Sequence, residues 1–332
     1  MLFFLKARVN IHRYQFHLFL KYLKIQPSIS VNFRKSPVSN LYRSAQFRSI
    51  WLNQEQTVFE QKEPFGAVYT GNVFGDIWIH ELSYTAEMRR ALNPYTFNVS
   101  LERAQFTDAL MRDQSYLKAS LEYNIEYTYA FNRSFDVRIF AGAFIQNTLR
   151  DGFSHIFNSF SLTSQGFNDY RYDDSYFGRN EQDGFWSQQI HINEGGMKAA
   201  LGGAQSLGRS NNFIFAVNLK SDLPQNLPLN LPLKPYFDLG YFSDKRAINS
   251  EATFDQKLWW SGGFTLDFFD GIVGVYLPVI NSKNGTLEVS GEPDPNGLRS
   301  LYKGKGNYWS RISFHIDFKR LNPWKAVDKL SF

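Results

Sequence analysis

The sequence predicts an all-β chain that folds as an antiparallel transmembrane β-barrel. Three observations support this: side chains alternate between apolar and polar, the strands are long, and the connections are sorted by length. The alternation is clearest in residues 117–131, LKASLEYNIEYTYAF, where every odd position is apolar or aromatic and nearly every even position is polar. Successive side chains of a strand point to opposite faces, so this segment would have one apolar face and one charged face.

The predicted strand over 117–131 is much longer than the typical strand of about 5–6 residues. A strand that crosses a membrane needs about 9–11 tilted residues. It alternates apolar-outward and polar-inward, with aromatic side chains at the two interfaces. Tyr127, Tyr129 and Phe131 gather at one end of the segment, as an aromatic girdle would require. A long soluble ribbon is the alternative interpretation of this one segment.

The same alternation recurs from end to end and predicts about twelve strands. The alternation is found in thirteen segments, residues 2–11, 13–22, 28–33, 43–52, 76–88, 95–104, 117–131, 134–147, 212–221, 234–242, 258–268, 271–280 and 308–318. Pro27 predicts a bulge, because proline cannot donate a hydrogen bond to a neighbouring strand. Two shorter segments, 186–192 and 196–201, flank an Asn-Glu-Gly-Gly turn.

The connections near the C-terminus alternate between short and long. Asn93-Pro94, Asn132-Arg133 and Phe269-Asp270 are predicted turns, whereas 243–257 and 281–307 are long connections. Outer-membrane barrels have short periplasmic turns and long extracellular loops. If the C-terminus is periplasmic, all three short turns fall on the periplasmic side. A closed sheet would also satisfy every backbone polar group in a medium without water.

Two regions are predicted along the chain. Residues 1–320 would form the barrel, in which 148–210 are a long extracellular loop with short strands that lies partly in the lumen. Residues 321–332 would form a short periplasmic amphipathic tail with a short helix. Asn322 would cap that helix, because a proline in the first turn and an apolar stripe follow it.

Composition excludes several function classes. The 332 residues include 17% aromatic residues and no cysteine, so there is no disulfide framework or thiolate metal site. The net charge of +5 comes without a concentrated basic run, which argues against a nucleic-acid partner. No apolar run is long enough for a transmembrane helix. Lys6 and Arg8 interrupt the apolar start, so no signal peptide is recognised. We therefore expect that Met1 is not the natural start of the precursor.

Three segments resemble one family of outer-membrane barrels. PYFDLGY (235–241), WWSGGFTLDFFDGIVGVYLPVINS (259–282) and RISFHIDF (311–318) are similar to the closing strands of the surface-antigen superfamily. Members of that superfamily assemble or translocate other proteins and typically have about sixteen strands. The resemblance implies that the strands present here belong to an incomplete barrel of that size.

The same resemblance implies candidate residues inside the barrel. The superfamily's aromatic-x-Asp-x-Gly pattern is matched by Tyr236, Asp238 and Gly240. In the superfamily, a long extracellular loop folds into the lumen and an arginine contacts the strand with this pattern. Arg171 and Arg179 are the candidates, since a buried guanidinium needs a carboxylate partner. The loop lacks the superfamily's Arg-Gly-aromatic tip, so the resemblance does not choose between them. Two solvated arginines are the alternative.

A closer resemblance suggests a parent protein. YRYDDSYFGRNEQDGFWSQQI (170–190) and the ending RISFHIDFKRLNPWKAVDKLSF (311–332) resemble the C-terminal barrel of Bacteroidetes-type outer-membrane proteins that carry an M1-family metallopeptidase domain upstream. The resemblance implies a membrane anchor in the outer membrane of a Gram-negative bacterium. Its partners would be outer-membrane lipid, the outer-membrane assembly machinery and an N-terminal peptidase domain of the same precursor.

This chain itself is not expected to be an enzyme, and no cofactor is predicted. M1 peptidases bind zinc through His-Glu-x-x-His, whereas residues 80–84 read His-Glu-Leu-Ser-Tyr. Two other function classes remain open beside the anchor. One is a stand-alone surface-antigen-like barrel for translocation or assembly. The other is a barrel enzyme or a calcium site, for which the candidate groups are His155 with Asp151, His191 with Glu194, and Asp173, Asp174 and Asp183.

Overall fold

The computed structural model describes most of the chain. The described residues are 2–15, 21–36, 38–62, 66–107, 113–131, 133–148, 158–179, 185–199, 208–223, 233–243, 253–254, 257–269, 271–282, 287–288 and 312–318. They form an all-β structure built on one twelve-stranded antiparallel sheet, as the alternation predicts. No helix in these residues has the length and apolar character needed to cross a membrane.

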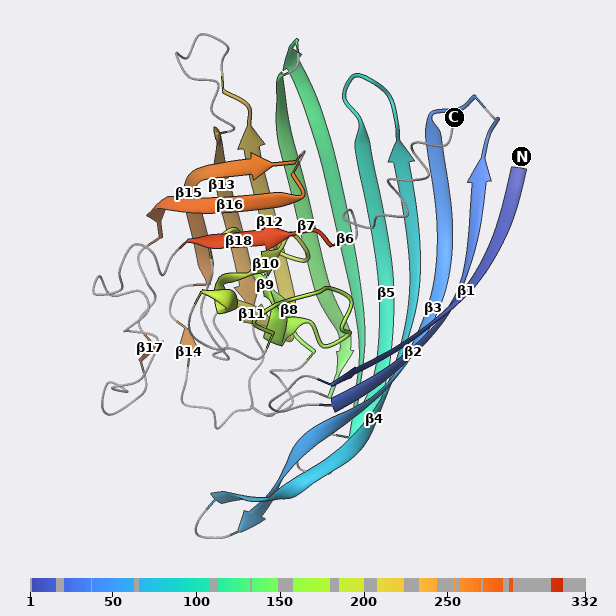
Figure 1. The fold of residues 1–332 in the computed structure, drawn as a ribbon, viewed down its shortest axis with the longest axis vertical. Helices are drawn as coiled ribbons and strands as arrows, with labels where there is room; N and C mark the ends of the chain where they lie inside the picture. The colour runs from blue at the N-terminus through green and yellow to red at the C-terminus, as the bar shows by residue number, and fades with distance from the viewer. Residues whose placement is uncertain are drawn as a thin grey trace.

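The strands of the sheet follow one another in chain order (Figure 1). They are β1 (Leu2–Gln15), β2 (Lys21–Arg34), β3 (Leu41–Lys62), β4 (Gly66–Met88), β5 (Tyr95–Thr107), β6 (Asp113–Ala130), β7 (Arg133–Asn147), β12 (Phe213–Ser221), β13 (Leu233–Ser243), β15 (Leu258–Phe268), β16 (Val273–Asn281) and β18 (Ser313–Ile316). Within the described residues no ladder joins β1 to β18, so these strands make a curved sheet with two edges.

Six short strands pair outside the large sheet. They are β8 (Phe160–Ser161), β9 (Ser164–Gln165), β10 (Ile190–His191), β11 (Arg209–Ser210), β14 (Thr253–Phe254) and β17 (Leu287–Glu288). β8 pairs with β11 and β9 pairs with β10, which ties the long connection between β7 and β12 together.

The two ends of the sheet differ in their connections. Residues 35–40, 89–94, 131–132 and 269–272 join strands at one end, which we call the turn end. At the opposite end, the loop end, the connection from β7 to β12 begins, and its residues 158–179 and 185–199 lie in the concavity of the sheet (Figure 1). The three predicted short turns all lie at the turn end, but the connections are not sorted by length along the whole chain. Only five, three and five residues separate β1 from β2, β3 from β4 and β5 from β6 at the loop end, and eleven separate β12 from β13 at the turn end.

Several predicted strand boundaries were wrong. Residues 13–22 do not form one strand, because β1 ends at Gln15 and β2 begins at Lys21. Pro27 lies inside β2, opposite Val9, and the β1–β2 register is continuous there. On the β3 side the paired residues step from Ile25 to Ser28, which accommodates the missing N–H of the proline.

The hairpin of β3 and β4 reaches well beyond the predicted 43–52 and 76–88. The two strands are 22 and 23 residues long. Residues 53–75 lack an apolar alternation. The sequence therefore did not predict that the pairing of β3 with β4 continues through them. Residues 186–192 contain a single 3₁₀ turn, η3 (Trp186–Gln188), followed by β10. The predicted helix in 322–332 lies outside the described residues.

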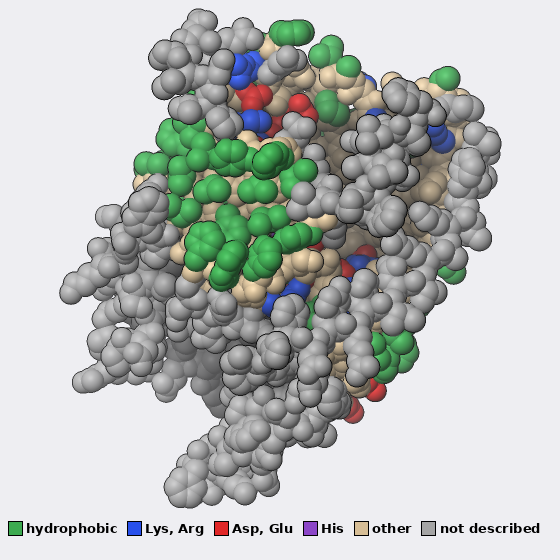
Figure 2. Space-filling model, viewed as in Figure 1, with side chains coloured by type: hydrophobic (Ala, Val, Ile, Leu, Met, Phe, Trp, Pro, Cys, Tyr) green, Lys and Arg blue, Asp and Glu red, His purple; other side chains and the backbone are tan. Residues whose placement is uncertain are grey.

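The faces of the sheet have opposite polarity near the turn end. We call the face that contacts residues 158–199 the inner face. On β5 the outward Val99 and Leu101 are exposed, whereas the inward Glu102 is buried among polar groups. On β6 the inward Lys118 and Glu122 bind charged or hydroxyl partners. Figure 2 shows hydrophobic side chains gathered over β15, β16 and β18; the exposed apolar residues of these strands include Phe264, Phe268, Val279 and Ile280.

This polarity reverses at one level of the sheet. Beyond it, toward the loop end, the inner face is apolar, with Ile50, Leu52, Ile77 and Ile79 buried in one cluster. The outer face becomes polar, and Asn53 Nδ2 there donates to Asp76 Oδ1 at 2.8 Å. The change falls at one level on three strands, between residues 48 and 49 of β3, 80 and 81 of β4, and 102 and 103 of β5, and one residue further toward the loop end on β6, between 116 and 117. We call this level the polarity switch.

Candidate functional site

The candidate site is the contact between the inner face of the sheet and residues 158–179 and 185–199, which we call the in-folded segment. Figure 1 shows it lying in the concavity of the sheet. Phe160, Leu162 and Met197 of this segment are buried against apolar side chains of β7, β12, β13 and β15. Gly142 of β7 permits the close approach of Phe160, because an added Cβ would lie 2.7 Å from its ring.

The aromatic-x-Asp-x-Gly pattern of β13 receives one end of the in-folded segment. Asp238 is fully buried, and its Oδ1 lies 2.6 Å from Nζ of Lys198. The backbone N–H of Lys198 donates to Oδ2 at 2.8 Å, and Nδ2 of Asn218 donates to Oδ1 at 3.0 Å. Both carboxylate oxygens are therefore satisfied, which a buried carboxylate requires. Burial lowers the pKa of Lys198, and the charge of Asp238 opposes that shift.

The other two residues of the pattern shape the same contact. Nζ of Lys198 lies 5.0 Å from the ring centroid of Tyr236, which is within range of a cation–π interaction. Gly240 leaves room for Leu162, because a Cβ at Gly240 would lie 2.5 Å from its Cδ2. The three residues thus form one docking surface for the in-folded segment.

The arginine expected at Asp238 is replaced by a lysine. Arg171 instead binds Oε2 of Glu81 at 2.6 Å and Oε2 of Glu102 at 2.9 Å. These partners lie on β4 and β5, several strands from β13, because residues 169–174 dock at the far side of the concavity. Lys198 follows the turn after β10 and is the cation that reaches β13. The resemblance implied Arg171 or Arg179 at this strand, whereas the structure places Lys198 there and both arginines on other carboxylates.

Arg171 belongs to a buried network at the polarity switch. Oε1 of Glu102 accepts hydrogen bonds from the hydroxyls of Tyr116 at 2.6 Å and Tyr170 at 2.5 Å, and Lys118 lies 3.5 Å away. The carboxylate of Glu102 thus has hydroxyl and cationic partners on both sides. Charge-assisted hydrogen bonds of this kind are shorter and stronger than neutral ones.

Asp173 carries the second half of this network. Lys24 lies 2.7 Å from its Oδ1, and Arg48 lies 3.0 Å from its Oδ2. Burial alone would raise the pKa of Asp173, but Arg171, Arg48 and Lys24 outweigh it and hold the pKa below its ordinary value. The network therefore joins β2, β3, β4, β5 and β6 to the in-folded segment through ionised groups.

Arg179 holds the in-folded segment to itself. Its Nη2 binds Oδ2 of Asp169 at 3.0 Å, and its Nη1 donates to the carbonyl of Gly166 at 3.1 Å. The carboxylate of Asp169 also accepts from the backbone N–H groups of Asp173 and Asp174. Neither candidate arginine is a solvated loop residue, since both are bound to carboxylates.

Of the groups considered for catalysis or calcium binding, His191, Glu194, Asp173 and Asp174 lie in the described residues. His191 contacts the ring of Tyr176, and Glu194 accepts from the backbone N–H of Ser161 at 2.6 Å. Burial raises the pKa of Glu194. His155, Asp151 and Asp183 lie outside the described residues. Among the residues that are described, no group of carboxylates and histidines is arranged to hold a metal ion.

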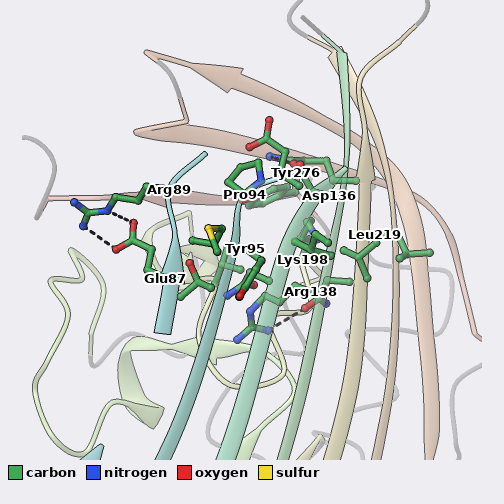
Figure 3. A pocket seen from close by; sticks show the side chains of 18 residues that line it. Glu87, Arg89, Pro94, Tyr95, Asp136, Arg138, Lys198, Leu219 and Tyr276 are labelled. Atoms are coloured by element: carbon green, nitrogen blue, oxygen red, sulfur yellow. Dashed lines mark hydrogen bonds and ion pairs between the residues drawn. The ribbon is translucent and has the colours of Figure 1, made fainter. Parts of the chain in front are cut away.

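A chamber of about 440 Å³ lies between the in-folded segment and the turn end of the sheet (Figure 3). Its lining carries charges of both signs, most of them paired. Arg138 binds Glu122 at 2.9 Å, and Arg89 binds Glu87 at 2.7 Å. Lys220 lies between Asp136 and Asp267. The lining also includes apolar side chains such as Tyr95, Ile125 and Tyr276.

Sequence reasoning missed most of this site. The two-residue alternation places four charged residues of the site on the inner face: Lys24, Arg48, Glu81 and Glu102. Nothing in the neighbouring sequence indicates which residues bind them. Lys198 lies in a segment predicted as a strand, and its contact with Asp238 spans 40 positions.

No protein-family model matches the chain, and no curated protein matches it.

Proposed function

We propose that this chain is an outer-membrane β-barrel domain that serves as a membrane anchor and scaffold. The observation that supports the proposal is the polarity of the sheet. From the turn end to the polarity switch, the outer face is apolar and exposed, and the inner face holds buried charges. A soluble sheet would place its apolar face inward, whereas a sheet in lipid faces its apolar side chains outward.

The in-folded segment favours an anchor over an open pore. It is joined to both sides of the concavity, at Asp238 on β13 and at the network around Glu102 and Asp173. Removing one partner of a buried ion pair costs about 3–5 kcal/mol, so displacing the segment would expose several such groups. A barrel with this plug would hold a second domain at the membrane without conducting solutes.

Membrane insertion is tested by flotation. The full chain, produced behind an export signal, should float with liposomes in a density gradient and resist extraction by urea. In planar bilayers the inserted chain should show only small conductance. Recovery in the soluble fraction would contradict the barrel, and a large steady conductance would contradict the plugged anchor.

We further propose that the anchored partner is an M1-type zinc aminopeptidase domain in the same precursor. The support is the resemblance of residues 170–190 and 311–332. Sequencing the DNA upstream of the Met1 codon tests this directly. An open frame that reaches a His-Glu-x-x-His motif and a signal peptide is the expected result. A frame that encodes no such motif would contradict it.

A surface-antigen-like barrel for translocation or assembly is the second candidate. The docking of the in-folded segment on Tyr236, Asp238 and Gly240 favours it, because the superfamily's pattern is used in that way. Such a barrel would act through a partner polypeptide at the turn end. Cross-linking from the turn residues 89–94 to an exported substrate protein would support it. Cross-links only within the chain would favour the anchor.

A further inference from the structure

Three polar side chains stand side by side on the outer face at the polarity switch. Ser49 of β3 is opposite His80 of β4, and His80 is opposite Arg103 of β5. Residues directly opposite each other in antiparallel strands have Cβ atoms about 4.5–5.5 Å apart. Polar groups are unusual beside an apolar outer band, so this row requires an explanation.

The row is bordered by apolar side chains on one side and by tryptophans on the other. Phe47, Leu82 and Leu101, one step toward the turn end, are all exposed on the outer face. Trp51 and Trp78, one step toward the loop end, have ring centroids 6.3 Å apart. Tryptophan is enriched at the level of lipid headgroups. The row therefore marks where the apolar band ends, at the depth expected of lipid phosphates.

The side chains of the row are arranged to bind an anion. Oγ of Ser49 is 3.0 Å from Nδ1 of His80, which leaves Nε2 available to a ligand. The imidazole is stacked on the rings of Phe47 and Trp78, at 6.2 and 6.4 Å. Arg103 is exposed, and within the described residues no carboxylate pairs with it. A guanidinium presents a planar fork of donors that matches phosphate oxygens.

We propose that Ser49, His80 and Arg103 bind the phosphate of an anionic membrane lipid. The inference rests on the proposed insertion in a membrane. Arg103 makes charge-assisted hydrogen bonds to the phosphate, and His80 donates a further one. The acyl chains of the lipid lie along Phe47, Leu82 and Leu101. Soluble phosphate has the same headgroup chemistry, but it lacks the chains that this apolar surface would cover.

The test compares two arginines of equal charge. The full chain is reconstituted in nanodiscs with equal amounts of phosphatidylglycerol and phosphatidylcholine, released into detergent, and its retained lipids are counted by native mass spectrometry. Near a membrane surface, one arginine changes anionic-lipid binding about five-fold. R103Q should therefore lower the retained phosphatidylglycerol about five-fold relative to the unmodified chain. R90Q, which removes an exposed arginine in the turn 89–94, should leave retention unchanged.

Three results would overturn the assignment. R103Q could retain as much phosphatidylglycerol as the unmodified chain, or R90Q could lower retention equally. Alternatively, glycerol phosphate in the buffer could displace the retained lipid, which would assign the row to soluble phosphate. A chain that fails to float with liposomes would contradict the proposed function instead, so the two failures are distinguishable.

Discussion

The two halves of β3, β4 and β5 use the same two-residue period with opposite phase. Toward the turn end, β4 points Leu82 outward and Glu81 inward; toward the loop end, it points Ile79 inward and Asp76 outward. The period reflects the backbone, whereas the phase reflects what surrounds each face. The half near the turn end resembles a sheet in lipid. The half near the loop end resembles a soluble sheet that packs on a core, here completed by Tyr170 and Tyr172 of the in-folded segment.

The buried charges lie where the two halves meet. Arg48, Glu81 and Glu102 are the last inward polar residues before the apolar cluster begins. The side chain of Glu102 is 2% exposed, compared with 37% for Glu87 at the turn end. Electrostatic interactions are stronger in the less polar surroundings, so the same type of ion pair should differ in its contribution to stability.

The largest expected effect on stability comes from removing a buried charge where the two halves of the sheet meet. Glu102→Gln should lower the free energy of unfolding by about 3–5 kcal/mol, because Arg171 and Lys118 lose a buried anionic partner. Urea unfolding of the reconstituted chain measures this. Glu87→Gln is the control, since it breaks only the exposed pair with Arg89 and should cost less than about 1 kcal/mol. Equal costs for the two variants would show that the network is not buried.

The second effect separates the lipid-facing half from the water-facing half. Leu121→Arg places a charge on the exposed apolar face of β6 and should destabilise the inserted chain by about 2–4 kcal/mol. Gln105→Arg lies on the outer face of β5 beyond the polarity switch and should change stability by less than about 1 kcal/mol. Folding into liposomes from urea gives both values. If Gln105→Arg cost as much as Leu121→Arg, the apolar band would extend past the switch.

A smaller effect tests the inward apolar cluster. Ile79 is fully buried, so Ile79→Val should cost about 0.5–1.5 kcal/mol through lost packing. Ile29 is on the outer face of β2 and 52% exposed, so Ile29→Val should stay within about 0.5 kcal/mol. The same unfolding measurement serves for both. A cost at Ile29 equal to that at Ile79 would mean that the two faces are packed alike.

The sequence predicted the strands better than the site. The alternation in 117–131 placed Lys118 and Glu122 on the inner face, and both lie there with buried partners. The two-residue period alone could not show where the apolar positions move from one face of the sheet to the other, because that change depends on what surrounds each face. The pattern Asp76-Ile77-Trp78-Ile79-His80 contains the signal, since its apolar isoleucines occupy the face opposite to Leu82.

Long-range pairs were beyond local reasoning for a different reason. The sequence gives the residue types of a network but not the fold of the segment that reaches it. The resemblance implied that an arginine would contact the strand with the pattern, and it suggested Arg171 or Arg179. Lys198 occupies that position because a turn at Gly195 and Gly196 brings it to β13, and Gly196 has a positive φ of 59°.

The smallest effect on stability near neutral pH comes from the protonation of two carboxyl groups of the in-folded segment, those of Asp173 and Glu194. The pKa of Asp173 is lowered, so the unfolded chain binds a proton there before the native chain does. Its contribution to stability is therefore present above about pH 4 and is lost as the pH falls further. The pKa of Glu194 is raised by burial, so the native chain binds that proton first and gains stability as the pH falls through the raised value.

The slope of stability with pH tells these two groups apart. Urea midpoints measured between pH 7 and pH 2 should rise slightly as Glu194 of the native chain becomes protonated and then fall below about pH 4, where the unfolded chain binds a proton at Asp173. Asp173→Asn should make that fall shallower, whatever its effect on the midpoint at pH 7, because the amide has no proton to gain. Glu194→Gln should remove the slight rise and leave the fall in place. If Asp173→Asn left the fall unchanged, the acid sensitivity would belong to other carboxyl groups, and the lowered pKa of Asp173 would not be its source.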